Sequence, residues 1–285
     1  MTNPNPQDHR KIMLELLREI DRICTEHGIS YMLFAGSALG AVRHRGFIPW
    51  DDDLDVIMLR EEYDRFLRYA PEELGKEYFL QKEYSEHWPM FFSKLRKNGT
   101  ACMEKLVPRD RCQHQGIYVD IFPADRLSDS ALLARLQFAA AKVVIAKSLY
   151  RRGYLTNSFG KKLFMCFCRL LPAEPFRRLA QLRGHTKTKR VHSFFGASRR
   201  FSKSVYPRRW FTETRRMPFE DGEYPVSSSF DELLRTLYGD YLTPSPPAER
   251  EVKVHAVLVD PEHSYEDYLD WQAKQQYNVY TRSIR

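Results

Sequence analysis

Apolar positions recur with helical spacing at the start of the chain. Residues 8–27 place their apolar side chains on one face, and Gly28 supplies a stop, which predicts an amphipathic helix. The apolar face consists of Ile12, Met13, Leu16, Leu17, Ile20, Ile23 and Cys24. A short apolar run at 29–35 then predicts a buried strand. Gly36 and Ser37 follow and are expected to open a short helix with Ser37 as its N-cap.

Short apolar runs and helical patterns continue along the rest of the chain. The runs predict strands at 53–58, 78–81, 91–96 and 117–122, the last ending at Pro123. Helical spacing predicts helices at 61–69, 128–152, 161–171, 176–183 and 230–237. The pattern therefore indicates an α+β protein, with an N-terminal core of strands and helices, a helical middle and a C-terminal return.

Composition and charge narrow the class of protein. The chain has 285 residues, of which 43% are hydrophobic and 13% aromatic, as expected for one large folded domain or two small ones. Residues 131–203 hold 17 Lys and Arg but one acidic residue, a net charge of +16, while the remainder holds 28 basic and 36 acidic residues, a net charge of −8. Such asymmetry indicates an anionic partner for one face: membrane phospholipid, an anionic glycan or nucleic acid.

The cysteines and the apolar runs bear on the compartment. The five cysteines are Cys24, Cys102, Cys112, Cys166 and Cys168, an odd and scattered set that predicts a reducing environment. Cys102, Cys112 and His114 form a weak zinc candidate, because their spacing is loose and no fourth ligand is evident. No apolar run approaches the ~20 residues of a spanning helix, and no secretory signal is apparent. We therefore expect a soluble, cytoplasmic protein.

The stretch Asp51-Asp52-Asp53-Leu54-Asp55 carries the strongest chemical signal. On an extended strand, residues i and i+2 point to the same side, so Asp53 and Asp55 are expected to share a face, joined by Asp51 if the strand begins early. Clustered carboxylates repel one another unless a cation neutralises them, and Mg²⁺ and Mn²⁺ prefer such oxygen ligands. A solvated acidic turn is the alternative, but carboxylates packed on an apolar strand are costly without a partner.

Two further features suit a phosphate chemistry. Asp120 lies within an apolar strand and is a candidate third ligand or general base, with a purely structural carboxylate as the alternative. Gly36 and Ser37, at the start of a predicted helix, offer backbone N–H groups and a hydroxyl to a phosphate. A phosphate held on one side and a metal on the other would suit in-line transfer at phosphorus.

Three basic residues are candidates for substrate binding. Arg43 follows the Gly-Ser turn and can contact a phosphate bidentately, or it can belong to a solvated helix end. Lys94 and Arg96 alternate on a predicted strand and therefore share a face. They are candidates for nucleotide contact, with surface charge as the alternative.

Three blocks of the sequence resemble the LicD family, the bacterial phosphocholine transferases related to fukutin-type proteins. The longest is residues 34–56, FAGSALGAVRHRGFIPWDDDLDV. The second is residues 116–123, with Asp120 inside Asp-Ile-Phe-Pro, and the third is Tyr-Gly-Asp-Tyr at 238–241. Together the blocks span roughly residues 10–250, and the central helices carry no matching motif.

The resemblance implies a fold and a domain organisation. It implies an α+β, nucleotidyltransferase-like fold with a mixed sheet core and a basic helical insertion. Residues 8–285 would form a single LicD-like catalytic domain. Within it, 28–125 would be the nucleotidyltransferase core, 126–204 the basic helical insert and 205–285 the C-terminal return.

The resemblance also implies an activity and its residues. A phospho-alcohol, typically phosphocholine from CDP-choline or a related CDP-alcohol, would pass to a sugar hydroxyl of a cell-surface glycan, a lipid-linked glycan or a lipopolysaccharide precursor, and CMP would leave. The carried-over ligands of Mg²⁺ or Mn²⁺ are Asp51, Asp53, Asp55 and Asp120, the last three also being the catalytic candidates. Gly36 and Ser37 match the family's phosphate-side turn. Independently of the resemblance, the charge of the basic helices at 131–203 predicts peripheral contact with the anionic inner face of the cytoplasmic membrane, with a solvated charged face on ordinary packing helices as the alternative.

Two other functions compete with this interpretation. A small-molecule nucleotidyltransferase would also use a Gly-Ser turn with Asp-x-Asp, and it would release pyrophosphate from a nucleoside triphosphate. The extended blocks around Pro49 and Asp120 argue against it. A nucleic-acid-binding protein would use the basic helices and bind with strong salt dependence. No nucleic-acid-binding motif supports that reading, which leaves the acidic cluster unexplained, so we expect no nucleic-acid partner.

Overall fold

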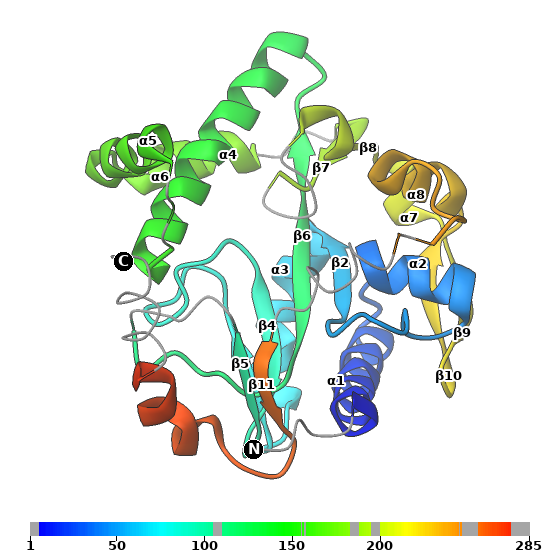
Figure 1. Cartoon of the computed structure of the whole chain (residues 1–285). Helices are drawn as coiled ribbons and strands as arrows, with labels where there is room; N and C mark the ends of the chain where they lie inside the picture. The colour runs from blue at the N-terminus through cyan, green and yellow to red at the C-terminus, as the bar shows by residue number, and fades with distance from the viewer. Residues whose placement is uncertain are drawn as a thin grey trace.

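A mixed β-sheet forms the centre of the molecule (Figure 1). The computed structural model describes residues 6–104, 110–154, 156, 158–182, 188–194, 200–244, 246 and 256–274. The strands run in the order β1-β2-β6-β4-β3, and β7 and β8 extend the sheet beyond β6. Their bounds are β1 Met32–Leu33, β2 Asp55–Leu59, β3 Tyr78–Gln81, β4 Ser93–Lys97, β6 Tyr118–Leu127, β7 Arg190–His192 and β8 Val205–Pro207. Since β2 and β6 pair in parallel and the other pairs are antiparallel, the predicted mixed sheet is confirmed.

Three N-terminal helices frame this sheet. They are α1 (Pro6–Glu26), α2 (Ala35–His44) and α3 (Arg60–Glu73). The predicted apolar stripe of α1 is buried in the main core, with Met13, Leu16 and Leu17 fully inaccessible. The helix predicted at 61–69 corresponds to α3, which buries Tyr63 and Phe66 as its spacing indicated.

The strand that carries Asp120 is longer than the sequence predicted. We expected Pro123 to end it, and this was wrong, because β6 continues to Leu127. Proline lacks an N–H donor and is tolerated in a strand only where no ladder bond is needed. On one side of β6 the pairing with β4 ends at Ile121, and the pairing with β7 begins at Asp125, so Pro123 falls in the gap between them.

A helical unit leaves the sheet after β6 and returns to it at β7. It comprises α4 (Ala131–Arg152), α5 (Phe159–Leu170) and α6 (Ala173–Gln181), close to the predicted helices. Leu127 of β6 pairs with Arg190 of β7, so the segment between them starts and ends at the same place in the sheet. Within the unit, α4 packs against both α5 and α6, to one side of the central strands (Figure 1).

The helix α8 (Phe230–Tyr238) was predicted, but several other elements were not revealed by the sequence pattern. They are β5 (Ala101–Glu104), which pairs with the C-terminal β11 (Ala256–Asp260), the hairpin β9 (Thr214–Phe219) and β10 (Gly222–Ser227), α7 (Arg209–Thr212), and the 3-10 turns Phe201–Lys203 and Tyr265–Tyr268. Phe219, Tyr224 and Val226 of the hairpin join the same core as α1. Across the described residues, none of the helices has both the length and the apolar character needed to cross a lipid bilayer.

Candidate active site

Three neighbouring strands bring charged residues side by side. Asp55 is the first residue of β2, and its register partner on the parallel strand β6 is Asp120. On the other side of β6, Lys94 of β4 is the register partner of Asp120. The structure therefore brings together three residues that are separated by up to 65 positions in the sequence.

The acidic segment before β2 does not have the geometry that we predicted. Asp53 and Asp55 were expected to share a strand face, but β2 begins at Asp55, and residues 51–54 have no regular structure. The carboxylates nevertheless gather. Burial raises the pKa of Asp55 well above its ordinary value, and the negative charges of Asp53, Asp120 and Asp51 raise it further, whereas Lys94 opposes them. The cluster therefore depends on the path of the irregular segment 51–54, which brings Asp51 and Asp53 near Asp55.

Gly36 and Ser37 lie directly against this cluster. The Ser37 hydroxyl oxygen accepts the backbone N–H of Asp55 at 2.8 Å, which fixes the start of β2 to α2. A Cβ atom added to Gly36 would lie 2.6 Å from Oδ2 of Asp51, so any other residue here would displace that carboxylate. The prediction of Ser37 as an N-cap was wrong, because α2 begins at Ala35 and Phe34 precedes it as the cap residue.

Lys94 is the cation of the site. Its side chain is 2% exposed, and its Nζ lies 2.9 Å from Oδ1 of Asp120 and 3.0 Å from Oε1 of Glu104. The ring centroid of Tyr118 is 3.1 Å from the same nitrogen, a cation–π contact. Desolvation lowers the pKa of Lys94 to about 7, the charge of Asp120 opposes that shift, and the cations of Arg96 and Arg152 add to it. Lys94 is therefore a buried partner of the carboxylates, and the alternative of surface charge was wrong.

The other two basic candidates are engaged within the fold. The guanidinium of Arg96 is buried and donates to Oε1 of Gln81 and to the carbonyl of Gly116, both at 2.7 Å. Arg43 lies near the end of α2 and donates to the carbonyl of Tyr241 at 2.6 Å. Both contacts tie separate elements together, and substrate binding by Arg43 and Arg96 stays a prediction.

One acidic residue of the site escaped the sequence analysis. Glu104, at the end of β5, contacts Lys94 through one oxygen and Arg152 of α4 through the other. No sequence pattern predicted Glu104, because β5 was not predicted and Glu104 gains its neighbours only through the tertiary fold.

The third family-like block, residues 238–241, also approaches the cluster. The pKa of Tyr238 is raised, first by removal of its hydroxyl from water and then by the charges of Asp55, Asp51 and Asp53, although the side chain as a whole is 40% exposed.

The carboxylate cluster fits a hard divalent cation. Oδ1 of Asp120 is buried and receives the ion-pair contact of Lys94, but among the described residues no donor reaches it with hydrogen-bond geometry. Oxygen atoms from Asp51, Asp53, Asp55 and Asp120 are the donor type that Mg²⁺ and Mn²⁺ prefer. Lys94 is shared between Asp120 and Glu104, while the charges of Asp53, Asp120 and Asp51 disfavour ionisation of Asp55. A cation held here would relieve the repulsion that acts on Asp55.

The residues considered for zinc are not assembled into a site. Cys102 is buried in β5. His114 accepts the backbone N–H of Gly116 at Nδ1, and its Nε2 lies 2.9 Å from Oδ1 of Asn98, so both ring nitrogens are engaged. Cys112 is exposed and lies near His87 and Asp110.

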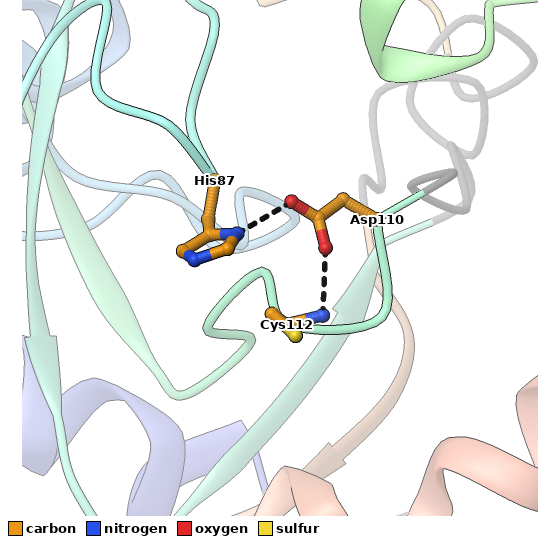
Figure 2. Close-up of side chains that lie close together, drawn as sticks. All are labelled: His87, Asp110 and Cys112. Carbon is orange, nitrogen blue, oxygen red and sulfur yellow. Dashed lines mark hydrogen bonds and ion pairs between the residues drawn. The ribbon is translucent and has the colours of Figure 1, made fainter.

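Cys112 forms a small cluster with His87 and Asp110 (Figure 2). Nδ1 of His87 lies 2.7 Å from Oδ2 of Asp110, and Oδ1 of Asp110 accepts the backbone N–H of Cys112 at 2.9 Å. The hydrogen bond that His87 makes to Asp110 raises the pKa of His87. The contacts within the cluster are thus those of a His87–Asp110 pair with a turn that Asp110 forms with the backbone of Cys112.

Comparison with known proteins shows which proteins this chain resembles. Residues 28–142 match the family model described as LicD/FKTN/FKRP, nucleotidyltransferase domain. Every predicted site residue lies within this range. The chain is also 26% identical over 267 residues to the lipopolysaccharide cholinephosphotransferase LicD of Haemophilus influenzae, covering 88% of this chain and 96% of that protein. Shorter matches are to uncharacterized proteins of Rickettsia typhi, 37% identical over 60 residues, and Rickettsia prowazekii, 33% identical over 75 residues. They cover 21% and 26% of this chain, and 19% and 28% of those proteins.

The predicted enzyme class is therefore confirmed: the chain is a transferase related to the cholinephosphotransferases. More narrowly, residues 28–142 are similar to the nucleotidyltransferase domain of the LicD/FKTN/FKRP family. The resemblance extends beyond that range, since the similar Haemophilus protein aligns along nearly its whole length. The match to the family model covers the same region in which the carboxylates and Lys94 meet.

Proposed function

We propose that this protein transfers phosphocholine, or a similar phospho-alcohol, from a CDP-alcohol to a hydroxyl of a cell-surface glycan or lipopolysaccharide precursor, releasing CMP. Support for the reaction class comes from the family match and from the printed activity of the Haemophilus relative. In this proposal, residues 28–125 are a nucleotidyltransferase-like core, and 126–204 are a basic helical insertion at the anionic inner face of the cytoplasmic membrane.

The observation that carries the proposal is the placement of Asp55 and Asp120 as register partners on parallel strands, where the charge of Asp120 helps to raise the pKa of the buried Asp55. Such repulsion between neighbouring carboxylates is typical of a site that holds a cation. Asp51 and Asp53 approach from the segment before β2 and complete an oxygen-rich set. These four residues would hold Mg²⁺ or Mn²⁺, which would stabilise negative charge on the donor's phosphate oxygens.

The residues of the chain have distinct roles in the proposed reaction. The acceptor hydroxyl oxygen forms a bond to the phosphorus that bears choline, and the bond from that phosphorus to the bridging oxygen of CMP breaks. Asp120 accepts the hydroxyl proton, and CMP departs with the bridging oxygen and its electron pair. Lys94 positions Asp120 through their ion pair. Gly36 and Ser37, which lie against Asp51 and Asp55, would border the phosphate.

CMP release from a panel of CDP-alcohols tests this function directly. The panel would include CDP-choline, CDP-ethanolamine, CDP-glycerol and CDP-ribitol, each with Mg²⁺ or Mn²⁺ and each with EDTA. We expect metal-dependent CMP release from one donor, abolished in Asp53→Ala/Asp55→Ala. A matched control is Asp221→Ala/Asp270→Ala, which removes two exposed carboxylates far from the cluster and should keep full activity.

The principal competitor is transfer of a nucleotide to a small molecule. The family model's description as a nucleotidyltransferase domain is compatible with it. It requires pyrophosphate release from a nucleoside triphosphate, with the nucleotide remaining on the acceptor. Pyrophosphate release without turnover of any CDP-alcohol would replace our proposal with this one.

A further inference from the structure

The helix α5 exposes an apolar face instead of burying it. Phe159, Leu163, Phe167 and Leu170 are 80%, 61%, 59% and 78% exposed. Their spacing of four, four and three residues aligns them along one side of the helix. We call these four residues the α5 face. A soluble helix ordinarily turns such a stripe toward the core, so this arrangement requires an explanation.

The opposite side of α5 supplies its attachment to the fold. Met165 and Cys168 are buried and pack with Ala146 of α4 in a small cluster of their own. Lys147 of α4 also donates to the carbonyls of Arg169 and Leu171, at 3.0 and 2.6 Å. The orientation of α5 is therefore held by its buried side and its end, and the α5 face points away from that packing.

Basic residues accompany the α5 face. Lys161, Lys162 and Arg169 are exposed on the same helix, and no acidic residue occurs in it. In the wider segment 131–203, 17 basic residues stand against one acidic residue. An apolar stripe flanked by cations complements a surface that is hydrophobic within and anionic at its edge. A bilayer containing anionic phospholipid has both properties, whereas the cationic surface of a second copy of this chain would be repelled by the same charges.

We propose that α5 lies in the interface of an anionic membrane, with the α5 face inserted among the acyl chains and with Lys162 and Arg169, beside that face, at the phospholipid headgroups. This deepens the proposed function, on which it rests for its biological purpose, by naming the surface that would bring the enzyme to a lipid-linked acceptor. The binding itself requires no catalysis, so its test is independent of the activity.

Vesicle co-flotation measures this binding. Wild type would be mixed with vesicles of pure phosphatidylcholine and with vesicles holding 30% phosphatidylglycerol (about the anionic content needed for a strong surface field). The test variant is Leu163→Ser/Phe167→Ser/Leu170→Ser. The matched control is Leu132→Ser/Leu136→Ser, which removes exposed apolar residues from α4 in the same basic unit. Circular dichroism and thermal unfolding would verify that both variants fold.

We expect wild type to bind anionic vesicles and to bind neutral vesicles far more weakly, with 0.5 M NaCl reducing the binding. The triple variant should lose about tenfold or more of its partitioning, and the control should keep it. Equal loss in the control, or unchanged binding by the triple variant, would overturn the proposal. A third outcome would also overturn it. In that outcome, sedimentation without lipid shows a dimer for wild type and a monomer for the triple variant, and both proteins bind vesicles equally. The α5 face would then join two copies of the chain.

These outcomes are separable from those of the proposed function. If the triple variant loses vesicle binding but releases CMP from a soluble donor at the wild-type rate, the docking surface is established apart from the chemistry. If wild type binds vesicles through α5 but turns over no CDP-alcohol, the proposed function fails and the docking surface stands.

Discussion

The two ends of the paired strands β2 and β6 handle buried carboxylates in opposite ways. At one end, Asp125 of β6 receives two hydrogen bonds from Arg60, at 2.7 and 3.3 Å, and Glu83 receives another at 2.7 Å. At the other end, Asp55 and Asp120 lie with two more carboxylates, and Lys94 is the cation in contact with Asp120. Four residues of β6, 121–124, separate the balanced cluster around Asp125 from the unbalanced one around Asp55 and Asp120.

The difference distinguishes a structural cluster from a functional one. Burial alone would lower the pKa of Arg60, but the charges of Asp125 and Glu83 outweigh it and raise that pKa, as expected for a closed ion-pair network. Around Asp55, burial and the charges of Asp53, Asp120 and Asp51 disfavour ionisation, and the opposing charge of Lys94 does not outweigh them. Repulsion on a buried carboxylate is maintained at a cost to stability unless a cation binds. The four predictions below test this contrast.

The largest expected effect is on catalysis at the unbalanced end. Asp55→Asn should lower kcat by about a thousandfold, because a ligand that is worth several kcal/mol of transition-state stabilisation is lost. The raised pKa means that the folded protein holds the Asp55 proton more tightly, so ionised Asp55 lowers stability as the pH rises above its ordinary 3.8. The metal-free variant should therefore melt at a higher temperature than wild type at pH 8, as followed by calorimetry.

Mg²⁺ sharpens the same comparison. It should raise the Tm of wild type and have a much smaller effect on Asp55→Asn, since binding to the native state stabilises it. A variant that retained more than a tenth of the wild-type kcat would show that Asp55 is not part of the machinery.

The balanced end should respond in stability and not in chemistry. Arg60→Met leaves Asp125 and Glu83 buried without their cation, and we expect a loss of about 3–5 kcal/mol in the free energy of unfolding. Urea titration measures this loss, with Arg18→Met as the control, because Arg18 pairs with Asp221 at an exposed site that should be worth less than about 1 kcal/mol. At low temperature the folded variant should keep its kcat within about threefold. A loss no greater than that of the control would contradict the structural role.

A buried histidine adds a third arrangement, a group kept neutral. His192 of β7 is fully buried, its Nε2 lies 2.8 Å from the carbonyl of Ala180, and Phe194 N–H points at Nδ1. Desolvation lowers its pKa to about 4, although the charge of Asp125 opposes this. Since the unfolded chain takes up the proton first, stability is present above pH 6.5 and is lost as the pH falls toward 4.

His192→Gln checks this origin of acid sensitivity. Between pH 7 and pH 5, wild type should lose about 2 kcal/mol more than the variant in urea unfolding. Parallel losses in the two proteins would assign the acid sensitivity to other groups.

The smallest effect concerns the close approach of Gly36 to the unbalanced cluster. Gly36→Ala would place a Cβ 2.6 Å from Oδ2 of Asp51, whose flexible end must move. We expect about a tenfold loss of kcat with little change in Tm, since slight misplacement of a catalytic group is costly. Gly160→Ala is the matched control, because no atom lies within 4 Å of its added Cβ on α5. That control should keep kcat and gain up to ~1 kcal/mol of stability. Similar kcat values in the two variants would contradict the role of Gly36.

Local patterning determined the main elements of the chain. The apolar stripe of α1, the helices α4 to α6 and the carboxylates at 51–55 and 120 were all evident, since helical period and strand alternation follow from backbone geometry. The family-like blocks added the class of enzyme. The basic character of 131–203 could also be read directly from composition, although the exposure of the α5 face could not.

Tertiary structure decided what these elements do together. It set the register that places Asp120 between Asp55 and Lys94, brought Glu104 to Lys94, and buried Arg96 within the fold. It also began β2 later than alternation suggested and carried β6 past Pro123. Sequence reveals which residue types occur and with what local period. Pairing between distant strands determines which charges are neutralised, because that depends on long-range register and burial that no local pattern contains.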